Sequence, residues 1–250
     1  AFALSALGRE REALEAYDRV CALDPRFLPA RRMKVVLERG QRNLREAIED
    51  AKKVVTDFPK ESGPYVDLAN LHLLEGRPED AQALVRSAID WGIPAGTLEE
   101  AQHLVTRALR GPLWPKSYEY KSEHYTVSSD INQRICFEAA TLLEKFYTKF
   151  NLHLRHVPPQ EKRVFRVFLF SGRAGYDAYT RDLIGQEKNN TNGLYSGLVK
   201  QLLIWNLPDF ENMMRTVRHE GFHQYLDRLT SDAPVWLNEG LAEYYEGSKL

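Results

Sequence analysis

The sequence has 250 residues, of which 43% are hydrophobic and 28% are charged, and its formal net charge is −1. A chain whose positive and negative charges nearly cancel has no broad basic surface, so we expect no nucleic-acid partner. No apolar run approaches the roughly 20 residues of a membrane-spanning helix, and the length is typical of two domains. With only Cys21 and Cys136, we expect no disulfide framework, and the compartment stays undecided.

The first half of the chain repeats itself with a period of 34 residues. Ala13, Ala47 and Ala81 share this spacing, as do Pro25 and Pro59. Small residues let helices approach closely, and proline ends a helical pair. The pattern resembles tetratricopeptide repeats, which are helical hairpins stacked into a solenoid. The resemblance implies two full repeats and the tail of an earlier one.

The helical domain is expected to span residues 1–112. Thr97 and Glu100 have the spacing of a capping box, which predicts a final helix that continues to Arg110. Gly111 and Pro112 then break the chain before the second domain, expected at residues 117–250. The repeats predict either a concave surface for a peptide or protein partner or a rigid spacer.

The second half predicts an α+β fold. Alternating polar and apolar residues indicate strands, and apolar residues at helical spacing indicate helices. Asp130 and Asp209 are in position to cap two of the helices. The expected elements are a strand at 118–128, a helix from Asp130 to Phe150, a strand at 164–170, a short helix from Ser171, a hairpin of 194–198 with 201–205, and a helix after Asp209.

The last of these helices carries the pattern His-Glu-x-x-His at residues 219–223. Because residues four apart lie about 40° apart around a helix, His219 and His223 face the same way. Two imidazoles one turn apart can bind one zinc ion. Glu220 lies to the side of them, where it can hold a water as a general base.

A second helix is expected at residues 234–246, with Leu237, Leu241 and Tyr244 at helical spacing. At about 1.5 Å of rise per residue, an antiparallel hairpin would place Glu239 level with His223. Glu239 is therefore the candidate third ligand. A further turn along, Glu243 suits a carboxylate that accepts a proton from a ligand imidazole.

The two motifs together resemble the gluzincin metallopeptidases, the peptidase MA-like group of thermolysin and aminopeptidase N. The resemblance rests on residues 219–223 followed by Trp236-Leu-Asn-Glu-Gly240. It implies a zincin-like catalytic domain that binds one Zn²⁺ per chain, with Asn238 contacting one ligand histidine. The metzincin alternative needs Gly and His where this chain has Leu226 and Leu229.

The resemblance implies a zinc peptidase in which Glu220 activates a water against a peptide or protein substrate. An oxyanion donor is also needed. In the family it lies downstream of the glutamate helix, so we expect it past Leu250, or else to be Tyr195, Tyr244 or Tyr245. The chain lacks an initiator Met and begins inside a repeat. We therefore expect a fragment or processed form, truncated at its C-terminal end, whose targeting segment lies outside it.

In this family an edge strand pairs with the substrate backbone, and the candidates are residues 193–197 and 202–205. Two other functions stay open. The chain could be a repeat-based binding module whose zinc site is structural or inactive. The same zinc chemistry could also act on a non-peptide amide.

Overall fold

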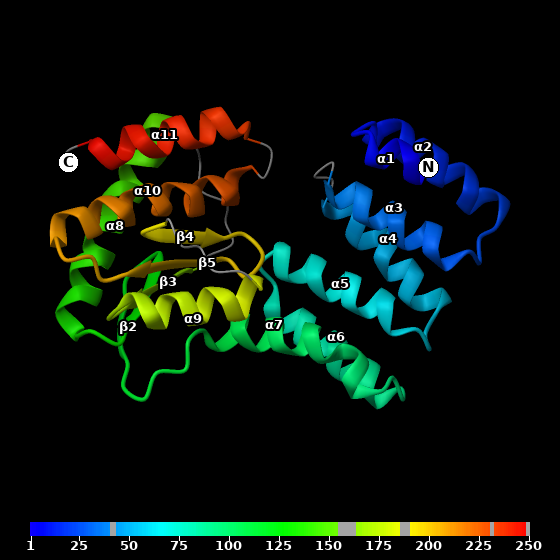
Figure 1. Ribbon diagram of the computed structural model, residues 1–250, viewed down its shortest axis with the longest axis horizontal. Helices are drawn as coiled ribbons and strands as arrows, with labels where there is room; N and C mark the ends of the chain where they lie inside the picture. Colours follow the sequence, from blue (N-terminus) through cyan, green and yellow to red (C-terminus); the bar gives the residue numbers. More distant parts are fainter. Residues whose placement is uncertain (41–43, 155–163, 186–190, 231–232, 249–250) are drawn as a thin grey trace. The chain divides into compact units, whose positions relative to one another are not determined.

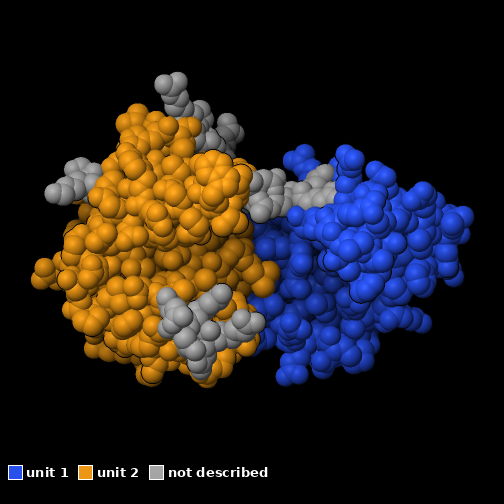
Figure 2. Space-filling view, turned by 45° about the horizontal axis from the view of Figure 1, so that its top comes forward, with its two compact units in different colours: residues 1–109 blue, residues 110–250 orange. Residues whose placement is uncertain are grey.

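The chain divides into two compact units, residues 1–109 and residues 110–250 (Figure 2). The computed structural model describes residues 1–40, 44–154, 164–185, 191–230 and 233–248. None of the described helices is long and apolar enough to cross a membrane.

The first unit is a series of helices in which each helix from α1 to α5 packs against the one that follows it (Figure 1). The helices α2 to α7 form the hairpin series, and α1 precedes them. Their bounds are α1 Phe2–Ala6, α2 Glu10–Leu23, α3 Leu28–Gly40, α4 Leu44–Asp57, α5 Ser62–Leu74, α6 Pro78–Asp90, the 3₁₀ helix η1 Ala95–Leu98, and α7 Glu99–Arg110.

The alanines of the 34-residue period lie where helices touch. Ala13, Ala47 and Ala81 have no exposed surface and lie in α2, α4 and α6. Gly8 and Gly76, which precede α2 and α6, have φ of 71° and 76°, a left-handed conformation that glycine adopts without a steric cost. The period therefore records a repeated helix–turn–helix unit.

The predicted capping box at Thr97 is wrong. The Thr97 hydroxyl donates to the carbonyl of Pro94 at 2.7 Å, so it does not cap the helix. Proline fixes its own φ near the value of a tight turn, and the chain forms η1 there before α7 begins at Glu99. The helix ends at Arg110, as expected.

The second unit is built on a five-stranded mixed sheet with the order β1-β2-β3-β5-β4. The two outer pairs, β1–β2 and β4–β5, are antiparallel, while β2–β3 and β3–β5 are parallel. The strand β4 therefore lies at one edge. The bounds are β1 Tyr118–Lys121, β2 Tyr125–Ser129, β3 Phe165–Phe170, β4 Gly193–Ser196 and β5 Gln201–Trp205.

The single strand predicted at 118–128 is instead the hairpin of β1 and β2. The reversal is stabilised by Glu144, whose carboxylate accepts hydrogen bonds from the Ser122 hydroxyl at 2.6 Å and the His124 backbone N–H at 2.7 Å. These two donors belong to the turn itself. The turn thus depends on a carboxylate far along the chain, which the polar–apolar alternation of residues 118–128 does not predict.

Four helices accompany the sheet: α8, α9 and α10 pack against it, with α10 and α9 on opposite faces, and α11 packs on α10 (Figure 1). They are α8 Gln133–Leu154, α9 Arg173–Ile184, α10 Phe210–Leu229 and α11 Val235–Gly247. Asp130 does not cap α8, contrary to the prediction. Asn132 does so by accepting from the Ile135 N–H at 3.0 Å, and Asp130 accepts from the Ser171 N–H at 2.6 Å.

An aromatic cluster joins α8, α10 and α11. The ring of Phe150 on α8 lies 5.3 Å from that of Phe222 on α10 and 4.7 Å from that of Tyr245 on α11. All three side chains are almost fully buried. Aromatic contacts of this kind stabilise a packed core beyond the area that they bury. The cluster fixes the position of α11 on α10.

The helix predicted at residues 234–246 is confirmed as α11, but two of the apolar residues that indicated it face outward, since Tyr244 is 58% exposed and Leu237 is 36% exposed. The residues that α11 buries are Ala242 and Tyr245. Tyr245 enters the aromatic cluster and thereby turns the other face of the helix outward.

The helix α10 packs closely against α8 at Gly221. A Cβ atom at Gly221 would lie 2.6 Å from Cδ2 of Leu143, which is fully buried. We predict that Gly221→Ala lowers the free energy of unfolding by about 1–3 kcal/mol through overpacking, although alanine favours a helix by about 1 kcal/mol. Urea unfolding of the metal-free protein measures the change.

Gly240→Ala is the matched control, because Gly240 also lies inside a helix and a Cβ there meets nothing within 4 Å. The control should be neutral or slightly stabilising. Equal effects from the two substitutions would show that close packing at Gly221 is not what decides stability.

Candidate metal centre

The helix α10 begins at a well-formed N-cap. The Asp209 side chain accepts hydrogen bonds from the N–H groups of Glu211 at 2.8 Å and Asn212 at 3.2 Å, which confirms the predicted cap. Two and a half turns later, His219 and His223 stand one turn apart. Their ring centroids are 4.8 Å apart. Both rings are partly buried.

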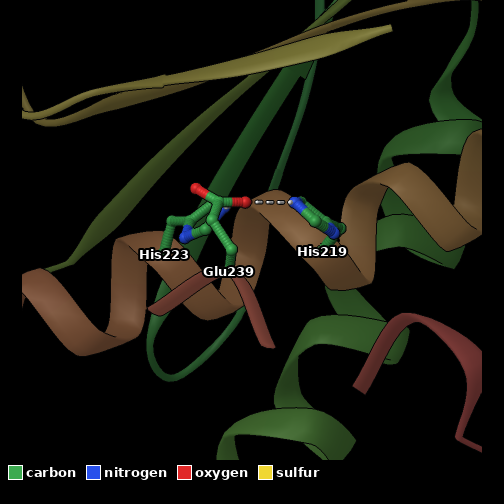
Figure 3. Close-up of side chains that lie close together, drawn as sticks. All are labelled: His219, His223 and Glu239. Carbon is green, nitrogen blue, oxygen red and sulfur yellow. Dashed lines mark ion pairs between the residues drawn. The ribbon is translucent and has the colours of Figure 1, made fainter. Parts of the chain in front are cut away.

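Glu239 reaches both histidines from α11 (Figure 3). Its Oε2 atom lies 3.6 Å from Nε2 of His219 and 3.6 Å from Nε2 of His223. The three potential ligand atoms lie within 4.8 Å of one another. Donors that share one zinc ion at about 2.1 Å lie roughly 3.3 Å apart in a tetrahedron, so a small contraction would suffice. The three residues form a group that could hold a metal ion.

The other ring nitrogens, Nδ1, have acceptors of their own. His223 Nδ1 lies 2.7 Å from Oδ1 of Asn238, and His219 Nδ1 lies 3.1 Å from Oε2 of Glu246. A carboxylate can only accept a hydrogen bond, so the Nδ1 of a neutral His219 carries the proton. The Nε2 lone pairs then face Glu239. This arrangement is how proteins orient histidines that bind a metal.

Glu246, and not the predicted Glu243, is the carboxylate that meets His219. Glu243 lies on an exposed part of α11. Relative to Glu239, a residue four positions later lies about 40° further around a helix, whereas one seven positions later lies only about 20° away on the other side. The face of α11 that carries Glu239 therefore brings Glu246 to His219. The helical period could have revealed this residue.

Glu220 lies beside the group in a largely enclosed position. Its Oε2 atom accepts a hydrogen bond from the backbone N–H of Tyr195 at 2.9 Å. Burial, opposed by His223 and by this hydrogen bond, raises the pKa of Glu220 to about 6, and the nearby carboxylates of Glu239 and Glu246 add to the rise.

The three tyrosines predicted as oxyanion donors or substrate contacts occupy different positions. The Tyr195 hydroxyl donates to Oδ2 of Asp227 at 2.6 Å, and the Tyr245 hydroxyl lies 3.1 Å from Nδ1 of His153. Both hydroxyls are thus committed to partners outside the metal group. Tyr244 lies on the exposed face of α11. It is Tyr195's backbone N–H, not its phenol, that contacts the group through Glu220.

Of the two candidate edge strands, β4 lies at the edge and β5 in the interior of the sheet. The start of β4 comes very close to α10. A Cβ atom at Gly193 would lie 2.8 Å from Thr216 Cγ2 and 3.0 Å from Glu220 Cγ. Only glycine allows this approach, and the sequence analysis did not single it out.

No protein-family model matches the chain. A comparison with curated proteins likewise finds no match. The residues of the group supply two imidazole nitrogens and one carboxylate oxygen. This donor set suits zinc and related divalent transition-metal ions.

The partners of Nδ1 give a direct test of the site. We predict that Glu246→Ala weakens Zn²⁺ binding about 10- to 100-fold, because His219 loses the acceptor that orients it. Competition with a chromophoric chelator measures the dissociation constant.

Glu243→Ala is the matched control and should change the affinity by less than about threefold. The assignment of Glu246 fails if Glu243→Ala is the variant that weakens binding and Glu246→Ala is not.

Proposed function

We propose that the second unit is a zinc-dependent peptidase of the gluzincin type. The observation that carries the proposal is the convergence of His219 Nε2 and His223 Nε2 on one oxygen of Glu239, each at 3.6 Å. Three protein ligands that leave a further position free are typical of catalytic zinc sites. Structural zinc sites are instead usually closed by four protein ligands.

The residues around the site support a hydrolytic role. A zinc ion held by these residues would supply Lewis acidity to a water molecule and to a carbonyl group. Glu220 would accept a proton from the attacking water and deliver it to the leaving amine. The hydrogen bond from Tyr195 N–H holds one oxygen of Glu220 and leaves the other for the water. Asn238 and Glu246 keep the imidazoles in the orientation that binding needs.

The position of β4 supports an extended peptide as the substrate. An edge strand has a row of backbone groups without partners in the sheet, which can pair with an added strand. In β4 this edge begins beside Glu220, because Gly193 approaches α10 closely. A peptide added there would run past the metal group. The helical repeats of the first unit would recruit a protein substrate or partner.

Metal content is the first test of the proposal. We expect roughly one zinc ion per chain after purification in zinc-replete medium, and a loss of that zinc in Glu239→Ala because a ligand is removed. Inductively coupled plasma mass spectrometry measures both. A wild-type protein that takes up no zinc would exclude the peptidase.

Glu220→Gln separates the peptidase from a binding module with a structural zinc site. We expect the variant to retain zinc but to lose at least about 100-fold in hydrolysis, a loss within the range of general acid–base catalysis. Release of fluorescence from a quenched peptide library measures the rate. Hydrolysis that survives Glu220→Gln would assign the proton transfer to another group.

A further inference from the structure

A second acidic residue of α10, outside the metal group, meets the edge strand. Oδ2 of Asp227 accepts hydrogen bonds from the Tyr195 hydroxyl at 2.6 Å and from Nζ of Lys200 at 2.5 Å. The three side chains are partly buried. Tyr195 lies in β4, and Lys200 is the last residue of the turn that joins β4 to β5. One carboxylate thus binds both the strand and the turn that follows it.

The backbone of Lys200 indicates that this contact shapes the hairpin. Lys200 has a φ of 54° and is the only non-glycine residue with positive φ among those that the structure describes. Residues with a side chain seldom adopt this conformation, and glycine or asparagine would be easier to place there. A lysine at this position is explained by the ammonium group, which forms an ion pair with Asp227.

The hydrogen bond from the Tyr195 hydroxyl to Asp227 persists over the neutral pH range. Burial, together with the neighbouring carboxylate of Asp227, raises the pKa of the Tyr195 phenol well above its usual value. The phenol therefore stays protonated over the whole neutral range and remains a donor. A hydrogen bond from a neutral donor to a carboxylate is stronger than one between two neutral groups.

The contact at Asp227 and the contact at Glu220 join the same residue of β4 to the same helix. Tyr195 donates its hydroxyl to Asp227 and its backbone N–H to Glu220. At the other end of the strand, Gly193 rests against Thr216 and Glu220. The strand is therefore held against α10 at Gly193 and at Tyr195. If Asp227 released it, the N–H that holds Glu220 would move too.

We propose that Asp227 is a positioning residue, which anchors β4 to α10 through Tyr195 and Lys200 and so holds Glu220 in place. The role rests on the proposed function, because Glu220 is the base of that reaction. Asp227 does not touch the metal group or the reacting atoms. Its removal should leave the three ligands in place and misplace only the base and the edge strand.

Hydrogen exchange tests the anchor without any assay of activity. The experiment compares the zinc-loaded wild type with Asp227→Ala by mass spectrometry of peptides that cover residues 193–197. We expect exchange at the Tyr195 amide to become at least tenfold faster in the variant, while peptides from α11 keep their protection. The zinc dissociation constant should change by less than about threefold. Unchanged exchange at Tyr195 would overturn the proposal.

Activity on a quenched peptide library then connects the anchor to Glu220. We expect Asp227→Ala to lower the rate per bound zinc at least tenfold. Lys200→Gly should lower the rate by a smaller factor, although glycine relieves the strained backbone at that position. Lys200→Arg should keep the wild-type rate, because arginine retains the cation. A role limited to folding predicts instead that Lys200→Gly is no worse than Lys200→Arg.

Glu211→Ala is the matched control, because Glu211 is an exposed acid near the other end of α10. It should leave both the exchange at Tyr195 and the rate unchanged. Faster exchange at Tyr195 in Asp227→Ala with an undiminished rate would refute the positioning role while leaving the peptidase intact. A wild type that binds zinc but cleaves no peptide would refute the peptidase, and exchange would still decide whether Asp227 holds β4.

Discussion

The candidate site depends on the antiparallel packing of α11 against α10. Two histidines one turn apart on α10 supply only two metal ligands, and the third has to come from a separate helix held at the correct height. Phe150, Phe222 and Tyr245 provide that constraint, because their buried rings join α8, α10 and α11. A shift of α11 by one residue along its axis, about 1.5 Å, would take Glu239 out of reach of one histidine. The buried aromatic cluster thus determines whether Glu239 can reach both histidines.

The balance of charge in the site also favours a cation. Glu220, Glu239 and Glu246 surround two imidazoles, and the proton on Nδ1 of each ring is directed away from Glu239. Carboxylates at such close range repel one another, and this repulsion contributes to the raised pKa of Glu220. Protonation of one carboxylate would relieve the repulsion, but that group would lose the negative charge on which its proposed role depends. A divalent ion relieves it while all three acids stay ionised, since the ion is the largest local charge in such a site.

The sequence predicted the parts of the structure that depend on local periodicity. The 34-residue period, the cap at Asp209 and the hairpin of β4 and β5 all follow from neighbours along the chain. What failed depends on distant side chains. Glu144 bends a predicted strand into two, and Tyr245 decides which face of α11 is buried. Glu246 is different, because the helical period alone places it on the same face of α11 as Glu239.

The helical period also explains how α10 performs separate tasks. At 100° per residue, His219 and His223 lie at about 0° and 40°, whereas Glu220 and Asp227 lie at about 100° and 80°. The two histidines therefore form one stripe, toward α11, and the two acids form a second stripe, toward β4. Because Glu220 and Asp227 are two turns apart on that stripe, one strand residue can reach both. Tyr195 does so with its backbone N–H and its hydroxyl. A spacing of seven residues between the two acids is thus enough for one strand residue to contact both.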